Sequence, residues 1–487
     1  MEAPRRLSSR GIIGICLLLC CVLLPWGLGI LVESTLAKAV RHSSPGYIRS
    51  VGSIEFSLWD RELTLHDVSI HALREKNVIS ASSFSGTLTW DMLWLALGIH
   101  KPAYDTHMPV LQQAVLKNCV LSSPHGEMRA ARIETDAFGI WRDFFTAPED
   151  SPLRVSSRIW WHMTLATMRM EGLRWHDSRF MGAQTLAVDS LQLQFWDNRN
   201  IDSLTLGGLT LAPRDSADNP TVGMKSLVLK NIHLPGESLL TQADKHGAAF
   251  SAAWITALCS GLLQGPYPLF ERATAQDIFS AGAQDAKAWH ARELTVAWPS
   301  SSPQRLNIQL GEVRLPTAAL ERISGLRFPA LPELRMQAAF SSRADKDGNT
   351  RQQLTLTCPA LADFTLETAC ASPTEPAGMP RLTAFSFSWQ DRALAVYLVG
   401  NLGGSKQDIT RYLQGLRLGR RSPREVLPAL QKFLEHSGTM TLTLADGKAV
   451  TLDNVPALWK NPADIVDIAV KTGTDDVLRQ ARGLFPQ

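Results

Sequence analysis

The sequence predicts a mainly β protein with helical insertions, a β-rich α+β fold that follows one N-terminal transmembrane helix. Two observations predict the strands: apolar and polar side chains alternate in runs rich in Leu, Val and Thr, and one octad recurs along the chain. An uncharged apolar run near the N-terminus predicts the membrane helix. Lys and Arg number 49 against 46 Asp and Glu, so no basic surplus indicates a nucleic-acid partner.

The apolar run covers Gly11–Val32 and contains no charged residue. A helix rises about 1.5 Å per residue, so this run spans about 33 Å, enough to cross a bilayer core. Arg5, Arg6 and Arg10 precede it. The positive-inside rule therefore places residues 1–10 in the cytoplasm and residues 33–487 across the membrane.

Two alternatives to a retained anchor stay open. Ala37-Lys38-Ala39 has the small-x-small pattern of a signal-peptide cleavage site, although the apolar run exceeds the usual 7–15 residues of a signal sequence. Cys20 and Cys21 invite a lipoprotein interpretation, which the bulky Leu17-Leu18-Leu19 before them disfavours. In each case the bulk of the chain is exported.

The octad reads apolar-x-apolar-x-(Asp/Asn/Gly)-apolar-x-apolar. Its apolar positions change phase at the centre, where a regular strand would turn its core side chains to the other face. A β-bulge with an extra residue at Asp67, Gly172, Gly208 or Asn231 restores the face, since Gly and Asn tolerate the required backbone. The copies occupy residues 63–70, 168–175, 204–211 and 227–234, with looser ones at 114–121, 308–315 and 450–457.

The first three copies along the chain begin at residues 63, 114 and 168, which predicts an elongated, curved antiparallel sheet built by repetition. A single sandwich of ordinary amphipathic strands is the alternative. Asp446-Gly447 predicts a tight hairpin turn. Helices are predicted at Asp91–Leu97, Glu237–Leu263 and Pro268–Ala286, after Ser405-x-x-Asp408, from Pro423 to about Ser437, and near Asp464–Val470.

These signals divide the chain into six parts. They are a cytoplasmic N-terminus (1–10), the transmembrane helix (11–32), an N-terminal sheet segment (33–235), a helical insertion (236–290), a C-terminal sheet segment with helices (291–475) and a tail (476–487).

Catalytic and cofactor motifs are missing from the sequence, so we expect no enzyme activity, no cofactor and no metal. Asp345 to Asn349 begins like a calcium loop. However, Thr350 stands where the loop needs Gly, and Leu356 stands where it needs Glu, which favours a hairpin turn.

Cys358 and Cys370 flank one predicted hairpin and form the candidate disulfide in an oxidising compartment. A simple hairpin centred on Ala360-Leu361 would instead pair Cys358 with Asp363, so both arrangements stay open.

Two groups of side chains are candidates for lipid contact, and each has a simpler structural explanation. The arginines between the C-terminal helices would contact anionic head groups or form a solvated face. The tryptophans of the N-terminal segment would fill a core, which we favour, or line an apolar groove. The head-group candidates are Arg417, Arg420, Arg421 and Arg424, with Arg411 nearby.

The segments at 50–58, 62–70, 78–88 and 115–121, which follow the basic N-terminus and the apolar run, resemble the start of an AsmA/TamB-like envelope protein. That resemblance implies an inner-membrane helix and a periplasmic, taco-like sheet with an apolar groove. It also implies a role in moving phospholipid or in outer-membrane assembly, without catalytic residues. The helical stretch at 237–290 departs from the family pattern, and the body is short for bridging two membranes.

We therefore expect a lipid-handling protein whose partners are the inner membrane, phospholipid and other envelope proteins, and not nucleic acid. The alternative is an envelope scaffold with a filled core that binds proteins, and an exported enzyme with a dispersed site is a third possibility. The lipid-groove candidates are Leu63, Leu65, Val68, Ile70, Trp59 and Trp90.

Overall fold

A computed structural model gives the fold, and it describes most of the chain beyond residue 46. The described residues are 34, 47–72, 77–96, 107–124, 126–141, 163–178, 184–197, 200–213, 221–234, 269–280, 289–298, 305–345, 349–371, 381–415, 423–445, 450–451 and 466–485. The apolar run at 11–32 lies outside them, as do the octad centre at 454 and the predicted helix at 237–263. Among the described residues, no helix is both long enough and apolar enough to cross a membrane.

The chain forms two compact units, which are considered separately. Unit 1 comprises Met1–Asp218 and Val228–Leu269, and unit 2 comprises Asn219–Leu227 and Phe270–Gln487. The division falls within one strand, Val222–His233. The predicted helical insertion (236–290) differs from this division, because residues 270–280 form a strand of unit 2.

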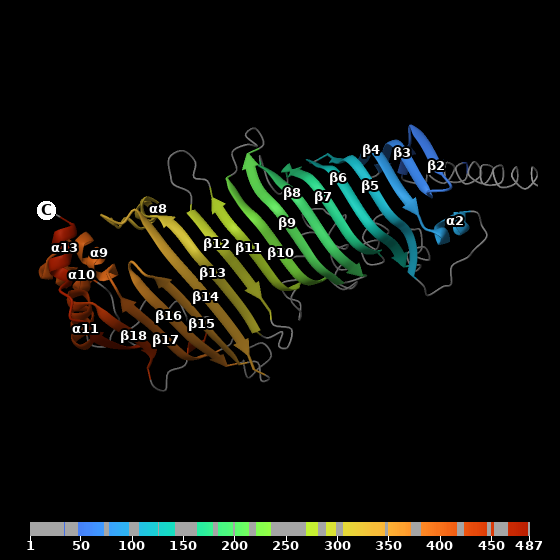
Figure 1. Ribbon diagram of the computed structural model, residues 1–487. Coiled ribbons are helices and arrows are strands. Elements are labelled where there is room, and N and C mark those ends of the chain that lie inside the picture. The colour runs from blue at the N-terminus through green and yellow to red at the C-terminus, as the bar shows by residue number, and fades with distance from the viewer. Residues whose placement is uncertain are drawn as a thin grey trace, which may run out of the picture. The chain divides into compact units, whose positions relative to one another are not determined.

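Unit 1 is an antiparallel sheet in which strands adjacent in the chain lie side by side (Figure 1). Strands β1 and β2 both pair with β3, and β9 pairs with β10. The strands are β1 (Tyr47–Ser50), β2 (Ser53–Ser57), β3 (Glu62–Ala72), β4 (Asn77–Leu88), β5 (His107–Ser123), β6 (Gly126–Trp141), β7 (Met163–Asp177), β8 (Gln184–Asp197), β9 (Asn200–Pro213) and β10 (Val222–His233).

Unit 2 continues the same plan of antiparallel neighbours. Its strands are β11 (Phe270–Ser280), β12 (Trp289–Ala297), β13 (Arg305–Pro316), β14 (Glu333–Ala344), β15 (Thr350–Cys358), β16 (Ala362–Ala371), β17 (Arg381–Asp391), β18 (Gly438–Leu444), β19 (Val450–Thr451) and β20 (Val466–Thr472). The described part of the chain is thus mainly β, as predicted, and its strands form a large, open antiparallel sheet.

In the described residues, helices are few and short. They are α2 (Trp90–Ala96) in unit 1, and α8 (Thr317–Ser324), α9 (Leu394–Asn401), α10 (Lys406–Gly415), α11 (Pro423–His436) and α13 (Val477–Leu484) in unit 2. Three predicted helix starts are confirmed. Helix α2 covers Asp91, the Ser405 hydroxyl accepts the Asp408 N–H before α10, and Pro423 begins α11. Ser437 and Gly438 have φ of 53° and 114° and end α11.

Two predicted helices are wrong. Pro268–Ala286 contains strand β11, and Asp464–Val470 overlaps strand β20. In β11, helix-favouring residues such as Ala275 pair with β12 and lie in a buried cluster, so sheet packing outweighs local propensity. The short alternating run of β20 places Ile468 and Val470 against the β18 residues Leu442 and Met440.

The hairpin turn predicted at Asp446-Gly447 lies outside the described part of the chain. Strands β18 and β19 do not pair with each other in the described register, because both pair with β17. They are therefore two successive pieces on one side of the same strand. The hairpin at Asp345–Thr350 is confirmed, since Ala344 pairs with Thr350.

The octads do change face where the sequence predicts. The six octad centres that the structure describes have left-handed backbone, which L residues seldom adopt within a strand. The φ values are 51° at Asp67, 50° at Asn118, 62° at Gly172, 63° at Gly208, 50° at Asn231 and 50° at Glu312. These residues form kinks in the strands, in agreement with the phase change of the octad.

The expected extra residue is absent from the kinks whose flanking pairs the structure describes in β3, β5 and β7. On either side of Asp67, His66 pairs with Ser83 and Val68 with Ala81, so the β3–β4 register is unchanged. The same holds around Gly172, where Glu171 pairs with Ser190 and Leu173 with Val188. The neighbouring strand changes face at the same level, which removes the need for a bulge. The octad of β13 differs, because its register against β14 shifts between Leu310 and Val313.

A second set of kinks was not predicted. Ala137 on β6 and Phe195 on β8 have φ of 52° and 49°. The register places both opposite Ala166 of β7. Beyond them, Leu165 and Trp196 return to the core face as a buried pair. Strands β6, β7 and β8 therefore change face twice, once at the level of the octad kinks and once at the level of Ala166.

Candidate functional site: the apolar sheet faces

The in-register kinks place the apolar side chains of unit 1 on one face of the sheet. Side chains alternate between faces along a strand, so residues paired directly across strands share a face. Direct pairing generates two continuous rows, one on each side of the octad kinks. The first is Leu65, Phe84, Leu116, Ile133, Met170, Leu191 and Leu206; the second is Ile70, Ile79, Leu121, Met128, Trp175, Leu186 and Leu211.

The end of this face near β3 is closed. Leu63 and Leu65 are buried and pack with Leu88 and with Leu93 of α2. Thr89 precedes α2, and its hydroxyl accepts the Met92 N–H at the first turn. The groove candidates Leu63 and Leu65 therefore contribute to a filled cluster, against which Val68 also packs. Ile70 is half-buried.

The middle of the face is less covered. Leu116, Ile133, Met170, Leu191 and Leu206 are all half-buried, and Ile79 in the second row is 44% exposed. These residues were not singled out from the sequence. The sequence signal is present on β4, where Ile79, Ala81 and Phe84 show the same phase change as the octad, without its Gly or Asn.

The tryptophan candidates are exposed. Trp59 is 76% exposed and Trp90 is 52% exposed, so the preference for core filling is wrong for both. Trp90 stacks on Trp94, with 6.1 Å between the ring centroids, and the Arg61 guanidinium lies 5.1 Å from the Trp90 ring. Trp196 is buried, as that preference requires.

Unit 2 has corresponding apolar rows. One consists of Ala275, Leu294, Leu310, Ala338, Leu356, Phe364, Trp389, Met440 and Val470. Its last strands carry helices: Trp389, Met440 and Val470 pack with Phe433 of α11 and Ile409 of α10 in a closed cluster. Figure 1 shows these helices gathered beside β17 and β18. Towards β15, Leu354 of the adjacent row is 39% exposed.

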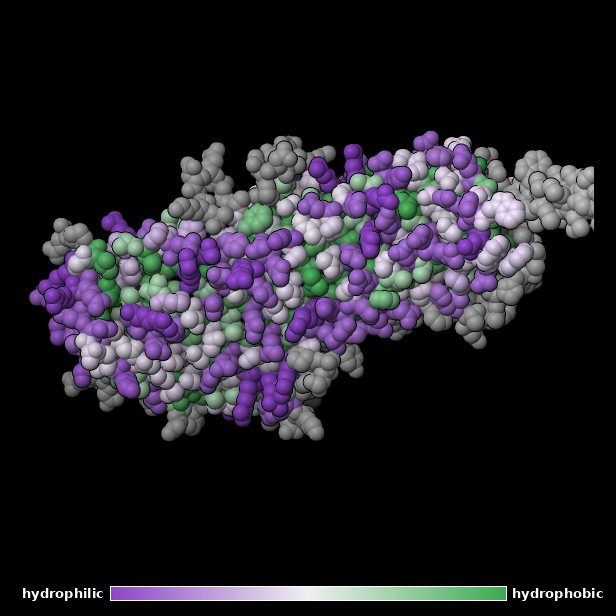
Figure 2. Space-filling view, in the orientation of Figure 1, coloured by the Kyte–Doolittle hydropathy of each residue, from purple (hydrophilic) through white to green (hydrophobic). Residues whose placement is uncertain are grey.

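Hydrophilic residues alternate with the apolar rows along the strands. In the side of the molecule shown in Figure 2, hydrophilic and hydrophobic residues are interspersed over the strands. On β8, Leu191 belongs to the first row, and the next residue, Gln192, pairs with Arg169 and Thr205 on the other face. The sheet of unit 1 therefore has one apolar face and one polar face.

The remaining sequence candidates do not form a site in the described structure. Arg417, Arg420 and Arg421 lie outside the described residues, Arg424 lies in α11, and Arg411 forms an ion pair with Asp408. Among the described residues, no His, Cys, Asp or Glu cluster is arranged to hold a metal.

The candidate disulfide is wrong. Cys358 and Cys370 are both free, because Cys358 pairs with Ala362 at the turn and Cys370 pairs with Thr350 at the far end of the hairpin. From residue 362 to residue 370 a strand extends about 26 Å at about 3.3 Å per residue, far beyond the reach of a disulfide. Burial raises the pKa of the Cys358 thiol.

Fold and site together define a mainly β protein whose antiparallel sheets have a partly covered apolar face. No protein-family model matches the chain, and no curated protein matches it in sequence.

Proposed function

We propose that this is a single-pass inner-membrane protein of the AsmA/TamB-like type whose exported β-rich body binds phospholipid acyl chains. The bound chains lie along the apolar face of unit 1, in the manner of a taco-like groove, and pass along it or support envelope assembly. The action is non-enzymatic. Residues 11–32 are the anchor in this proposal.

One observation carries the proposal: the apolar rows run unbroken from β3 to β9, and their middle members are half-buried. An acyl chain laid along such a row gains about 0.8 kcal/mol for each CH₂ removed from water. Passage along the row needs no chemical step, because successive strands present equivalent apolar positions.

A scaffold that binds other envelope proteins is the second candidate, and the closed clusters favour it. Leu63 and Leu65 are covered by α2, and the end of the unit 2 face is covered by α10 and α11. A protein partner would cover the half-buried middle strands as these helices cover the ends.

The discriminating experiment places a photo-crosslinking amino acid at Leu191, on the apolar face, or at Gln192, on the polar face, of the full-length protein in cells. The adjacent position is a matched control, because both lie on β8 and differ in the face they occupy. Irradiation should attach phospholipid at position 191 and not at 192. Protein adducts at 191 without lipid would establish the scaffold instead.

A loss-of-binding variant complements the crosslinking. In a folded protein, Leu191→Asp should abolish phospholipid that co-purifies with the full-length chain, whereas Gln192→Asp should retain it. Equal lipid content in both variants would contradict binding on this face. The intact mass of the same preparation reports whether the chain is cleaved after Ala39 or keeps residues 11–32.

A further inference from the structure

Three arginines lie side by side on neighbouring strands of unit 2. Arg343 on β14 pairs directly with Arg305 on β13 and with Arg351 on β15. They lie on the polar face, because their strand neighbours Leu306 and Ser342 share the register of the apolar face. This arginine row is therefore independent of the apolar rows and of the function proposed for them.

Like charges directly opposite each other destabilise a sheet. Two other strand arginines of unit 2 lie beside carboxylates: Arg292 pairs with Glu312 at 3.1 Å and Arg335 with Glu333 at 3.1 Å. In the described part of the chain, no carboxylate forms an ion pair with a member of the arginine row. Arg305 is half-buried, and its Nε is buried without a hydrogen-bond partner.

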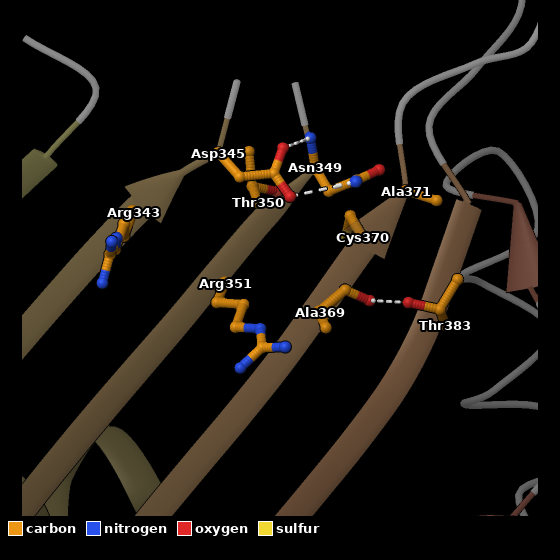
Figure 3. A pocket seen from close by; sticks show the side chains of 9 residues that line it. All are labelled: Arg343, Asp345, Asn349, Thr350, Arg351, Ala369, Cys370, Ala371 and Thr383. Atoms are coloured by element: carbon orange, nitrogen blue, oxygen red, sulfur yellow. Dashed lines mark hydrogen bonds between the residues drawn. The ribbon is translucent and has the colours of Figure 1, made fainter. Parts of the chain in front are cut away.

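Two members of the arginine row, Arg343 and Arg351, line a pocket at the ends of β14 to β17 (Figure 3). The pocket has a volume of about 540 Å³, and Arg343 and Arg351 contribute to its lining. Ala369, which pairs with Arg351, and Ala371 leave space over β16, and Figure 3 shows the Arg351 side chain extended towards Ala369.

Hydrogen bonds fix the rim of the pocket. The Asp345 carboxylate accepts hydrogen bonds from the Asn349 backbone N–H and side-chain amide at 2.9 and 3.0 Å, and the Thr383 hydroxyl donates to the Ala369 carbonyl at 3.1 Å. Asp345 is the acidic residue of the lining, so the two guanidinium groups of Arg343 and Arg351 outnumber one carboxylate.

We propose that the arginine row binds a phosphate group, carried by a lipid head group or by a soluble phosphorylated ligand. Guanidinium groups present forked N–H donors that match phosphate oxygens, and a bound dianion offsets the repulsion between the three arginines. The small side chains of Ala369 and Ala371 leave the remainder of the ligand room over β16.

The test uses the full-length protein in detergent micelles and inorganic phosphate as the probe, with chloride at matched ionic strength. Calorimetric titration should give saturable binding that Arg343→Gln/Arg351→Gln weakens about tenfold or more, since each lost charge-assisted hydrogen bond costs about 1.5–3 kcal/mol. Arg335→Gln is the matched control. It removes an arginine from the same strand and face, but one that Glu333 neutralises, and should change the affinity less than about twofold.

Thermal unfolding supplies a second readout, because the double variant should lose phosphate affinity without losing stability. In phosphate-free buffer the double glutamine variant should unfold at the same temperature as the wild type or above it, because it loses the repulsion. Phosphate should then raise the midpoint of the wild type alone. If the double variant does not fold, Arg343→Lys/Arg351→Lys keeps the charge but loses the forked geometry, and its phosphate affinity should also fall.

Dihexanoyl phosphatidic acid, used below its micellar concentration, distinguishes the two sources of phosphate. Tighter binding than inorganic phosphate, lost in the double variant, assigns a lipid head group; equal binding assigns a soluble ligand. Absence of saturable phosphate binding in the wild type overturns the proposal. Equal affinity in the wild type and the double variant also overturns it.

Discussion

Gly208 on β9 faces Asp189 on β8 across the row of kinks, and a methyl group at Gly208 would collide with the Asp189 carboxylate. Gly208 also has φ of 63°, which costs an L residue about 1–2 kcal/mol. The kink and the close approach of the two strands thus depend on the same glycine.

Gly208→Ala should destabilise the protein by about 2–4 kcal/mol, since it adds the collision to the backbone strain. Urea unfolding measures the change. Gly311→Ala is the control, because its Cβ would come no closer than 3.9 Å to the Glu293 carbonyl. In the double variant, Asp189→Ala should restore part of the stability lost on Gly208→Ala. If Gly208→Ala costs as much in the Asp189→Ala background as in the wild type, the contact is refuted.

Truncation of the buried Leu93 of α2 should destabilise the protein more than truncation of the larger but exposed Trp94. Leu93→Ala removes a side chain that is 2% exposed and packs on Leu63 and Leu65, at a cost of about 2–5 kcal/mol. Trp94→Ala removes a larger side chain that is 41% exposed, and should cost about 1 kcal/mol or less. Hydrogen exchange of the α2 amides measures the destabilisation in both variants. Faster exchange in Trp94→Ala than in Leu93→Ala would contradict this packing.

Asp391 should make the stability of unit 2 depend on pH. Burial raises the pKa of Asp391 from 3.8 to about 6, although its carboxylate accepts the Ala395 N–H at 3.0 Å at the start of α9. Because the pKa is higher in the folded state than in the unfolded state, protonated Asp391 favours folding, and this contribution is fully present below about pH 4. It is lost as pH rises through about 6.

Asp391→Asn keeps an acceptor for Ala395 and removes the ionisation. Between pH 4 and pH 7, the unfolding free energy of the wild type should fall relative to this variant by up to about 3 kcal/mol, which corresponds to about two pKa units. Chemical denaturation across this pH range measures the difference. Parallel pH profiles for the two proteins would show that Asp391 ionises as freely in the folded state as in the unfolded state.

The two cysteines of the β15–β16 hairpin should react independently. Cys358 is 3% exposed and burial raises the pKa of its thiol, whereas Cys370 is half-buried. Alkylation of the native protein near pH 7.5 should therefore modify Cys370 well before Cys358, as peptide mass spectrometry would show. Reductant should leave the unfolding temperature unchanged, and a reductant-sensitive transition lost in Cys358→Ser would contradict the free thiols.

Local sequence patterns predicted much of the fold. Two-residue alternation predicted a mainly β chain, and the octad located the kinks at Asp67, Gly172, Gly208 and Asn231. Capping residues located the starts of α10 and α11. These features depend on side chains within a few residues of each other, so one strand or helix start carries its own signal.

Pairing partners were beyond such local signals. The kinks at Ala137 and Phe195 contain no Gly or Asn that would have marked them in the sequence. Strand β11 contains several residues that favour a helix. The candidate site shifted for the same reason: Leu63 and Leu65 match the octad as well as Leu206 does, but α2 covers only the first two.

The sequence by itself determined the β-rich composition, the alternation of faces and the face changes at the octad centres, because these follow from backbone preferences and side-chain period. The tertiary structure alone decided that adjacent strands change face at the same level, that Cys358 and Cys370 lie at opposite ends of a hairpin, and that three arginines stand side by side. Those relationships depend on register, which is set by cross-strand packing between residues distant in the chain.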